Sequence, residues 1–331
     1  MIIEATKSLI EGENLTLIDT REVFDEVLSG LSDEIQTSAF LTALKTKKTT
    51  NDELLGGILS SKEAINIPKI AFNNQTSIQN LCLEKTSNIL DISLIQDLIC
   101  CANELSIAKF AFEDNSFKTL ETLGVNLKEE KDLTSLDFEN LNFAYIYLSK
   151  NSPYYKYTHK IARSGLFDEI LNPIFAFLNP LNSKNIFLGV KDKKDVQKYA
   201  NIALSLNYEN SIIVSNNNFP FLSLEKESFV AEAWKNKIFT YVITPDLLGF
   251  KEASNNDLIY KDKKENADIV LGILEGKIKD FRYDFAILNS ALSLYISKKA
   301  DSIMDGINLA KKTIDTGLAN EKLNQIKNFY K

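Results

Sequence analysis

The feature of this 331-residue chain that most constrains its fold is a change in the spacing of apolar residues near position 65. Before that point, apolar residues recur at the spacing of amphipathic helices. After it, short apolar runs that suit buried strands alternate with helical stretches. Such alternation favours an α/β fold with a mostly parallel sheet. We therefore expect two domains, a small all-helical domain over residues 1–64 and a large α/β domain over residues 65–331.

Capping signals divide the first domain into short helices. Asp19 with Glu22 fits a capping box, Ser32 is placed to cap the next helix, and Thr50 with Glu53 forms another box. Two of these helices carry apolar residues at helical spacing, which predicts that their side chains are buried. The residues are Ile35, Ala39, Phe40 and Leu44 of one helix, and Leu54, Leu55, Ile58 and Leu59 of the other.

In the second domain, helical stretches over 93–105 and 194–206 separate several of the strand-like runs, and the chain is helical again from 265 to 330. Gly276, Gly306 and Gly317 are expected near helix ends or at close contacts between helices. The predicted strands cover 78–83, 107–112, 143–147, 186–190, 211–214 and 238–243.

The distribution of charge argues against a nucleic-acid-binding protein. The formal net charge is −7, and residues 1–64 hold 6 bases and 12 acids. The remaining residues hold 32 bases and 33 acids, so neither part has the excess of lysine and arginine that contacts with phosphates require. We expect nucleic-acid binding to be weak.

Cysteine usage and hydropathy indicate a cytoplasmic protein. No apolar run approaches the roughly 20 residues of a membrane span, and the first residues lack the pattern of a signal peptide. The three cysteines, Cys82, Cys100 and Cys101, form no C-x-x-C pair, so we expect them to pack in the core in a reducing compartment. With one histidine, His159, a zinc site is not expected.

Three segments, taken in order, resemble the anthranilate phosphoribosyltransferases, also grouped as glycosyltransferase family 3. Residues 31–45 (LSDEIQTSAFLTALK) with 50–56 (TNDELLG) are similar to the family's first helices, and 118–127 (KTLETLGVNL) to its "LEALGVNL" segment. The strongest match lies in the C-terminal helices, at 265–267, 274–276, 289–295 (NSALSLY), 306–310, 313–317 and Leu323.

The resemblance implies a small helical domain, a large α/β domain and a cleft between them, with a homodimer formed through residues 1–64. It also implies the family's reaction in tryptophan biosynthesis, the transfer of a phosphoribosyl group from phosphoribosyl pyrophosphate to anthranilate with magnesium. Such a site needs backbone N–H cradles for phosphate, a basic residue and carboxylates for the metal.

The phosphate-binding motifs of the family are largely replaced in this chain. At the place of its "GTGGD" turn stand residues 81–85 (LCLEK), and of its "N-x-S-T" helix start Ser93 remains. At the place of its "KHGNR" loop stand residues 109–113 (KFAFE), where Lys109 remains and the arginine has become Glu113. By resemblance, Ser93 and Lys109 are the candidate phosphate-binding residues, although a solvated or strand-edge Lys109 is the interpretation we favour. We expect no backbone cradle at 81–86.

The metal and anthranilate sites are also altered. Phe221 and Leu222 stand at the distance of the family's magnesium-binding "DE" pair, with Glu225 and Glu227 nearby. Side chains of phenylalanine and leucine offer a hard cation no oxygen, so we predict no metal ligands and no cofactor, with Mg²⁺ expected only in an active transferase.

The family's "FNLLGPLTNP" run reads IFAFLNPLNS at 174–183, where Asn179 replaces the glycine. Arg163 is the candidate substrate-binding residue, in place of the family's carboxylate-binding arginine. Ser152 or His159 stands in place of the family's histidine, and the register between residues 152 and 173 is open.

Three functions remain. The first is a homologue without the family's activity, a pseudoenzyme that acts as a binding or scaffold protein for an unknown ligand or protein partner, and this is the one we favour. The second is an active phosphoribosyl or glycosyl transferase with a rebuilt site. The third is a nucleic-acid-binding member of the family, against which the charge counts argue.

Overall fold

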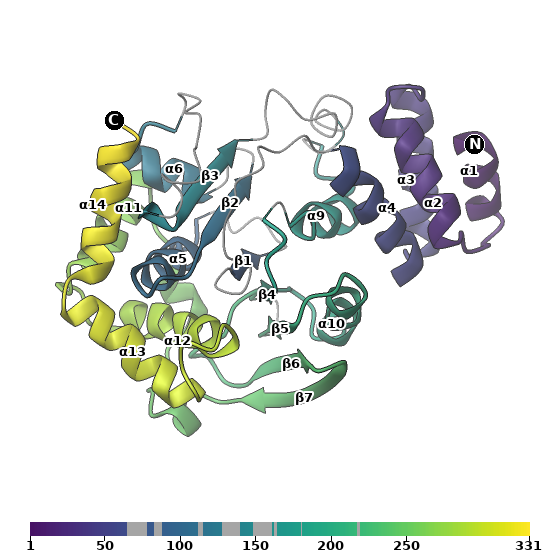
Figure 1. Cartoon of the computed structure of the whole chain (residues 1–331). Coiled ribbons are helices and arrows are strands. Elements are labelled where there is room, and N and C mark those ends of the chain that lie inside the picture. Colours follow the sequence, from purple (N-terminus) through teal and green to yellow (C-terminus); the bar gives the residue numbers. More distant parts are fainter. Residues whose placement is uncertain are drawn as a thin grey trace. The chain divides into compact units, whose positions relative to one another are not determined.

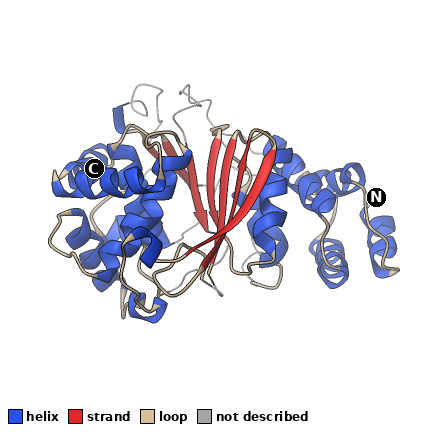
Figure 2. Cartoon of the chain, turned by 90° about the horizontal axis from the view of Figure 1, so that it is seen from below, coloured by secondary structure: helices blue, strands red, loops and turns tan. Residues whose placement is uncertain are grey.

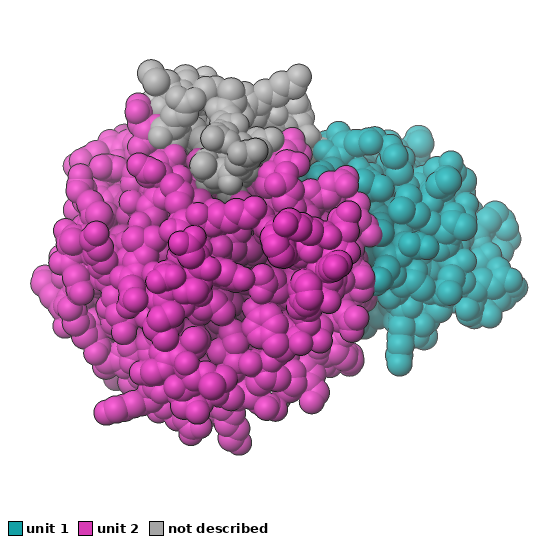
Figure 3. Space-filling model, turned by 60° about the horizontal axis from the view of Figure 1, so that its bottom comes forward, with its two compact units in different colours: residues 1–68, 147–180 teal, residues 69–146, 181–331 magenta. Residues whose placement is uncertain are grey.

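The computed structural model describes residues 1–64, 78–82, 88–111, 115–127, 140–147, 161, 164–179, 181–216 and 219–331. The contacts divide the chain into two compact units, coloured separately in Figure 3. One unit comprises residues 1–68 with 147–180, and the other comprises 69–146 with 181–331. No helix in the described part of the chain is both long and apolar enough to cross a membrane. The domain boundary between residues 64 and 65 stays a prediction.

The first unit is helical. Helix α2 packs against α4, α1 packs against α3, and α9 packs against α4 (Figure 1). Its core holds the ring pair Phe24–Phe40, with centroids 5.9 Å apart in an edge-on arrangement. The expected N-terminal helical region is therefore confirmed. Its described elements are α1 (Ile2–Ile10), α2 (Leu17–Leu28), α3 (Glu34–Lys47), α4 (Asn51–Ala64) and α9 (Asp168–Ala176).

Two of the three predicted caps were placed wrongly. Helix α2 begins three residues earlier than expected, because Thr16 forms the reciprocal capping box with Asp19. Helix α3 is capped by Asp33 with Gln36 as its partner, one residue after the predicted Ser32. A carboxylate and a hydroxyl both accept from the free N–H groups of a first turn, so neighbouring candidates are hard to separate by sequence.

The third box, Thr50 with Glu53, is confirmed. The Thr50 N–H donates to Glu53 Oε2 at 2.7 Å, and the Glu53 N–H donates to Thr50 Oγ1 at 3.3 Å. The same carboxylate is fully buried and ion-paired with Lys47 at 2.9 Å, and it accepts from the Leu15 N–H at 2.9 Å. Glu53 thus connects the loop between α1 and α2 with the loop between α3 and α4.

Helix α3 buries a different face from the expected one. Phe40 and Leu44 lie in the core as predicted, but Ile35 is 80% exposed and Ala39 is exposed too. The inward stripe of α3 is completed by Thr37, Leu41 and Ala43.

The second unit is built on a five-stranded sheet in the order β1-β4-β5-β6-β7, with a separate two-stranded sheet of β2 and β3. Strands β1, β4 and β5 run parallel, whereas β6 and β7 are antiparallel to their neighbours. The expected α/β class is confirmed, and the sheet is mixed at its β7 side. The strands are β1 (Ile78–Cys82), β2 (Ile107–Ala111), β3 (Phe143–Tyr147), β4 (Asn185–Gly189), β5 (Asn210–Ser215), β6 (Ser228–Trp234) and β7 (Lys237–Ile243).

Helices cover the sheet on both sides, as Figure 2 shows. Helix α10 packs on β5, β6 and β7, whereas α12 packs on β4 and β5 and against α5. In Figure 1, α10 and α12 lie on opposite faces. The helices that the structure describes in this unit are α5 (Ile92–Ala102), α6 (Asn115–Thr122), α10 (Asp195–Ser205), α11 (Lys263–Leu274), α12 (Phe281–Ile296), α13 (Ile303–Asp315) and α14 (Leu318–Phe329), with short 3-10 turns at Asp246–Leu248 and Asn255–Leu258.

The three glycines singled out by sequence occupy the expected kinds of position. Gly276 and Gly317 follow helices with positive φ of 69° and 78°. Gly306 faces α12 so closely that a Cβ would clash with the carbonyl oxygen of Ala291. The C-terminal helices therefore pack through a contact that only glycine permits.

Candidate functional site

The two predicted phosphate-binding residues of the second unit lie together. Lys109 is on β2 and Ser93 is in the first turn of α5, and the lysine ammonium donates to Ser93 Oγ at 2.5 Å. The backbone segments that carry them are separate in sequence but adjacent in space, because α5 packs on β2. Their role toward a phosphate stays a prediction.

The Lys109 side chain is buried rather than solvated, so the first half of our favoured interpretation was wrong, whereas its place on an edge strand is not contradicted, because β2 belongs to a two-stranded sheet. Its side chain is 9% exposed, and its ammonium is ion-paired with Asp97 Oδ2 at 2.9 Å. It also donates to Ser116 Oγ at 3.1 Å. An ammonium group has three N–H donors, and with Ser93 this makes three oxygen partners from the same chain.

Asp97 is held in a buried polar network that reaches β1 and α12. Its Oδ1 accepts from Asn80 Nδ2 at 2.9 Å, and Asn80 Oδ1 accepts from Ser293 Oγ at 2.7 Å. Gln96 Nε2 donates to Ser293 Oγ at 2.6 Å. Burial raises the pKa of the Asp97 carboxyl to about 6, although the neighbouring Lys109 ammonium acts in the opposite direction.

A second carboxylate completes the surroundings of Lys109. Asp91 caps α5 by accepting from the Leu94 N–H at 3.0 Å, and its Oδ1 also accepts from Ser116 Oγ at 3.0 Å. The Asp91 N–H donates to Asn266 Oδ1 at 3.1 Å, which connects α5 with α11. Two carboxylates, that of Asp97 directly and that of Asp91 through Ser116, are therefore linked to the one lysine ammonium.

The positions that we matched to the family's metal pair are part of the core. Phe221 is 3% exposed and Leu222 is fully buried, and Phe221 packs on Phe219 with centroids 5.5 Å apart. The Asn289 side chain accepts from the Leu222 N–H at 3.0 Å and donates to the Leu222 carbonyl at 3.0 Å. This amide fixes the segment on α12.

The two acidic residues near that segment differ in surroundings. Glu225 Oε2 accepts from the Asn255 N–H at 2.8 Å and from Ser254 Oγ at 3.3 Å. Glu227 is exposed. Within the described ranges, no group of three or more His, Cys, Asp or Glu side chains is arranged to hold a metal ion. The oxygens at this place do not fit an octahedral magnesium site built on a carboxylate pair.

Several predicted site residues lie outside the described residues. They include most of the 81–85 loop, Glu113, Arg163, Ser152 and His159. Of the loop, Leu81 and Cys82 are described, and they end strand β1. Asn179, at the place of a family glycine, has a positive φ of 46°, a conformation that asparagine adopts more readily than most residues.

Comparisons with known proteins decide the family. Residues 3–60 match the helical bundle domain of the glycosyl transferase family, and residues 85–320 match its a/b domain. The chain belongs to this family. The predicted resemblance to anthranilate phosphoribosyltransferases is confirmed, because curated relatives with that name match along nearly the whole chain.

Two relatives show how far the similarity extends. The anthranilate phosphoribosyltransferase of Lacticaseibacillus paracasei is 28% identical over 98% of this chain and 96% of its own length. The anthranilate phosphoribosyltransferase of Methanobrevibacter smithii is 28% identical over 98% of this chain and 97% of its own length.

Solved structures of this glycosyl transferase family share the fold. The anthranilate phosphoribosyltransferase from Thermus thermophilus aligns with a TM-score of 0.89 at 21% identity, over 98% of this chain and 99% of that one. The Saccharomyces cerevisiae enzyme in complex with PRPP and Mg aligns with a TM-score of 0.82 at 20% identity, over 99% and 97%.

The sequence did not lead us to the polar residues that hold the core together through buried hydrogen bonds. Asp97 and Asn80 lie inside segments that were interpreted as a core helix and a core strand. Asn289 was quoted for its family resemblance, but its clamp on Leu222 was not foreseen. A signal was present, because a polar residue within an otherwise apolar helix or strand needs a hydrogen-bond partner when it is buried.

Proposed function

We propose that this chain is a phosphoribosyltransferase-like protein without the family's transferase activity, which acts by binding a ligand or a protein partner. The single observation that carries the proposal is the state of Lys109. Its ammonium contacts Asp97, Ser93 and Ser116, so the cation that matches a phosphate-binding residue of the family is neutralised within the fold. A pyrophosphate would have to displace a buried carboxylate to reach it.

The surroundings of Phe221 and Leu222 support the same proposal. A transferase of this family must stabilise the charge of a pyrophosphate leaving group, and loss of one well-placed electrostatic contact costs roughly two to three orders of magnitude in rate. At the place matched to the metal pair, both side chains are buried and apolar, and the backbone of Leu222 is bound by Asn289. We therefore derive no step through magnesium.

A fluorescence assay of anthranilate consumption tests the proposal. Purified chain is incubated with anthranilate, phosphoribosyl pyrophosphate and Mg²⁺, with the Lacticaseibacillus paracasei relative as the positive control. We expect the control to consume anthranilate and this chain to consume none above the background without enzyme. Steady turnover that scales with the concentration of this chain would contradict the proposal.

The alternative function is an active phosphoribosyl transferase with a rebuilt site. The observation that favours it is the similarity to curated anthranilate phosphoribosyltransferases over 98% of the chain. Under this alternative, Arg163 would bind the substrate carboxylate and Ser93 with Lys109 would bind phosphate, with Mg²⁺ held by residues other than Phe221 and Leu222. Turnover in the same assay, lost in Lys109→Met, would support it.

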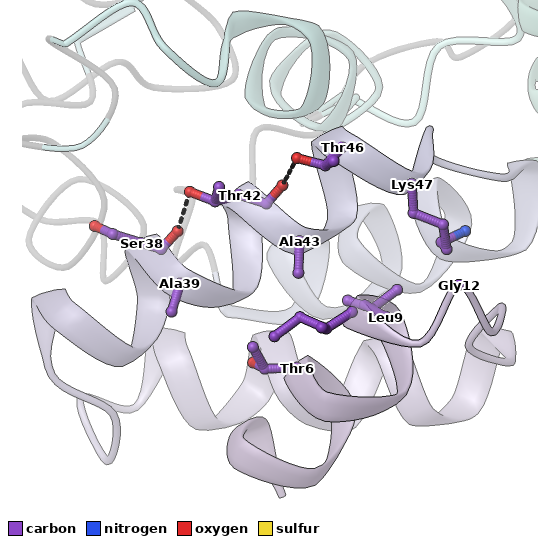
Figure 4. A pocket seen from close by; sticks show the side chains of 10 residues that line it. Thr6, Leu9, Gly12, Ser38, Ala39, Thr42, Ala43, Thr46 and Lys47 are labelled. Carbon is purple, nitrogen blue, oxygen red and sulfur yellow. Dashed lines mark hydrogen bonds between the residues drawn. The ribbon is translucent and has the colours of Figure 1, made fainter.

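We also propose that the chain forms a homodimer through residues 1–64. This segment exposes several large apolar side chains. Between α1 and α3 lies a groove of about 570 Å³ lined by Leu9, Ala39 and Ala43 (Figure 4). The exposed side chains are Met1, Ile3, Ile10, Ile18, Leu31 and Ile35.

The threonine hydroxyls that line this groove are already hydrogen-bonded within their own helices. The Thr42 hydroxyl donates to the Ser38 carbonyl at 2.7 Å, and the Thr46 hydroxyl donates to the Thr42 carbonyl at 2.8 Å, as Figure 4 shows. Thr6 donates in the same way to the Ile2 carbonyl at 2.7 Å. These hydroxyls are satisfied by their own helices, so an apolar partner can cover them without breaking a hydrogen bond.

A further inference from the structure

Strand β7 is the outermost strand of the five-stranded sheet. In the described part of the chain it pairs with β6 on one side and with no strand on the other, and it lies at the margin of the sheet in Figure 1. Phe239 is 51% exposed, Val242 is 40% exposed, and Thr240 is exposed as well. The outer side of β7 is therefore open to solvent.

This edge lacks the features by which proteins usually protect an outer strand. Natural edges are blunted by proline, by charged side chains or by bulges. Strand β7 contains no proline, and its one charged residue, Lys237, stands at its start. Its residues pair with β6 in unbroken register, so the strand has no bulge. A free edge rich in β-branched and aromatic residues is a template for pairing with another strand.

The turn between β6 and β7 identifies the backbone groups that point outward. Residues 235–236 have positive φ, at 49° and 60°, as in two-residue hairpin turns, where the residue after the turn donates its N–H to the residue before it. The backbone of Lys237 is thus directed toward β6. Because this direction alternates along an antiparallel strand, Ile238, Thr240 and Val242 direct their N–H and carbonyl groups away from β6.

We propose that β7 pairs with β7 of a second copy of the chain, in an antiparallel arrangement whose two-fold axis passes through Thr240. The outward backbone groups then meet their own counterparts. Ile238 lies opposite Val242 of the partner subunit, and Thr240 lies opposite Thr240 of the partner subunit. Such a two-fold interface uses the same patch on both copies, so the patch must be complementary to itself.

The side chains of β7 meet this requirement. Phe239 lies opposite Tyr241 of the partner subunit on one face of the joined sheet, and Ile238 lies opposite Val242 of the partner subunit on the other. Aromatic and β-branched pairs that are directly opposite stabilise antiparallel strands. The Tyr241 hydroxyl donates to Glu232 Oε2 at 2.9 Å, which holds its ring in place before a second copy arrives.

The distribution of charge favours the same arrangement. The turn end of β7 is basic, because Lys235 and Lys237 are exposed there, and the other end is followed by the exposed Asp246. Antiparallel pairing brings the basic end of one copy to the acidic end of the other, and it keeps the two Lys237 side chains at opposite ends of the strand pair. A parallel pair would place these lysines side by side, which is destabilising.

Sedimentation equilibrium tests the proposal with the unaltered chain, Thr240→Lys, Thr240→Glu, and an equimolar mixture of the two variants. A single strand pair buries little surface, so we expect association only well above micromolar concentration. The weight-average mass of the unaltered chain should rise by about half or more between roughly 5 and 500 µM. Because the mass is compared between concentrations, the result is independent of the homodimer proposed through residues 1–64.

The variants test the position of the axis. Thr240 is exposed, so a charge there disturbs no buried contact within one copy. Each variant places two like charges opposite each other and should associate about tenfold or more weakly than the unaltered chain. In the mixture lysine lies opposite glutamate, and association should return. Thr240→Ser is the matched uncharged control and should associate as the unaltered chain does.

Amide hydrogen exchange of the unaltered chain at the same two concentrations requires no substitution. We expect exchange at Ile238, Thr240 and Val242 to slow at the higher concentration, because their N–H groups then donate to the second copy. Four outcomes would overturn the proposal. They are a mass that does not rise, undiminished association of either charged variant, a mixture without recovery, and exchange rates at these amides that are equal at both concentrations.

Discussion

The Asp97 carboxylate lies 2.9 Å from the Lys109 ammonium, and both side chains are almost completely withdrawn from solvent. A buried ion pair is weak evidence for stability, because the cost of removing two charges from water offsets their attraction. The raised pKa of Asp97 shows which effect is larger at this carboxyl: burial favours the neutral form more than Lys109 favours the charged form. The ion pair therefore holds the Lys109 ammonium against Asp97, and the buried charge of Asp97 lowers the stability of the fold.

The first prediction concerns the pH dependence of stability. The folded pKa of Asp97, about 6, lies above the ordinary value of 3.8. The stability contribution of this carboxyl is therefore fully present below about pH 3.8 and is lost as the pH rises through 6. Relative to Asp97→Asn, we expect the unaltered chain to lose roughly 2 kcal/mol of unfolding free energy between pH 4 and pH 7. Urea unfolding followed by circular dichroism measures this difference, and a constant difference across the range would contradict the assignment.

The second prediction concerns the clamp on Leu222. In Asn289→Ala, the Leu222 N–H and carbonyl both lose their partner in a buried place. We expect the free energy of unfolding to fall by about 2–4 kcal/mol, because each unsatisfied buried polar group costs roughly 1–3 kcal/mol. Asn324→Ala on the exposed side of α14 is the matched control and should change stability by less than about 0.5 kcal/mol. If the two substitutions lower the free energy of unfolding equally in chemical denaturation, the hydrogen bonds of Asn289 to Leu222 do not stabilise the fold.

The third prediction concerns the homodimer. Ile10 and Ile35 are 73% and 80% exposed, so a double change to aspartate should leave the helical fold intact while placing charge in the proposed interface. We expect sedimentation at micromolar concentration to give a dimer for the unaltered chain and a 37.3 kDa species for the variant. Leu247→Asp, at a 68% exposed position of the other unit, is the control and should remain dimeric. A monomeric unaltered chain would contradict the proposal.

Much of the fold could be predicted from the sequence, because its signals are local. The period of apolar residues located the predicted strands to within a residue or two at each end, and 143–147 was found as predicted. Strand β6 was missed because Glu232 interrupts its apolar pattern. Its turn was also inconspicuous: Lys235 and Asn236 both have positive φ, at 49° and 60°, as in the tight hairpin turns that usually contain glycine.

The candidate site could not be predicted to the same extent, because its contacts are long-range. Sequence resemblance placed Ser93 and Lys109 in one site, and they do lie together. Nothing local indicated that Asp97, one turn along α5 from Ser93, would take the lysine as its partner. Burial of Ile35 was predicted wrongly for a related reason, since the helical period identifies an apolar stripe without specifying what covers it.

Isothermal titration of the unaltered chain with phosphoribosyl pyrophosphate and Mg²⁺ at pH 7.5 tests the central claim most directly. The claim is that Lys109 is neutralised by Asp97 and that the place matched to the metal pair is apolar core. The account predicts no binding heat above the dilution control at millimolar ligand, whereas the Lacticaseibacillus paracasei relative should bind under the same conditions. Micromolar, Mg²⁺-dependent binding by this chain that is lost in Lys109→Met would contradict the account.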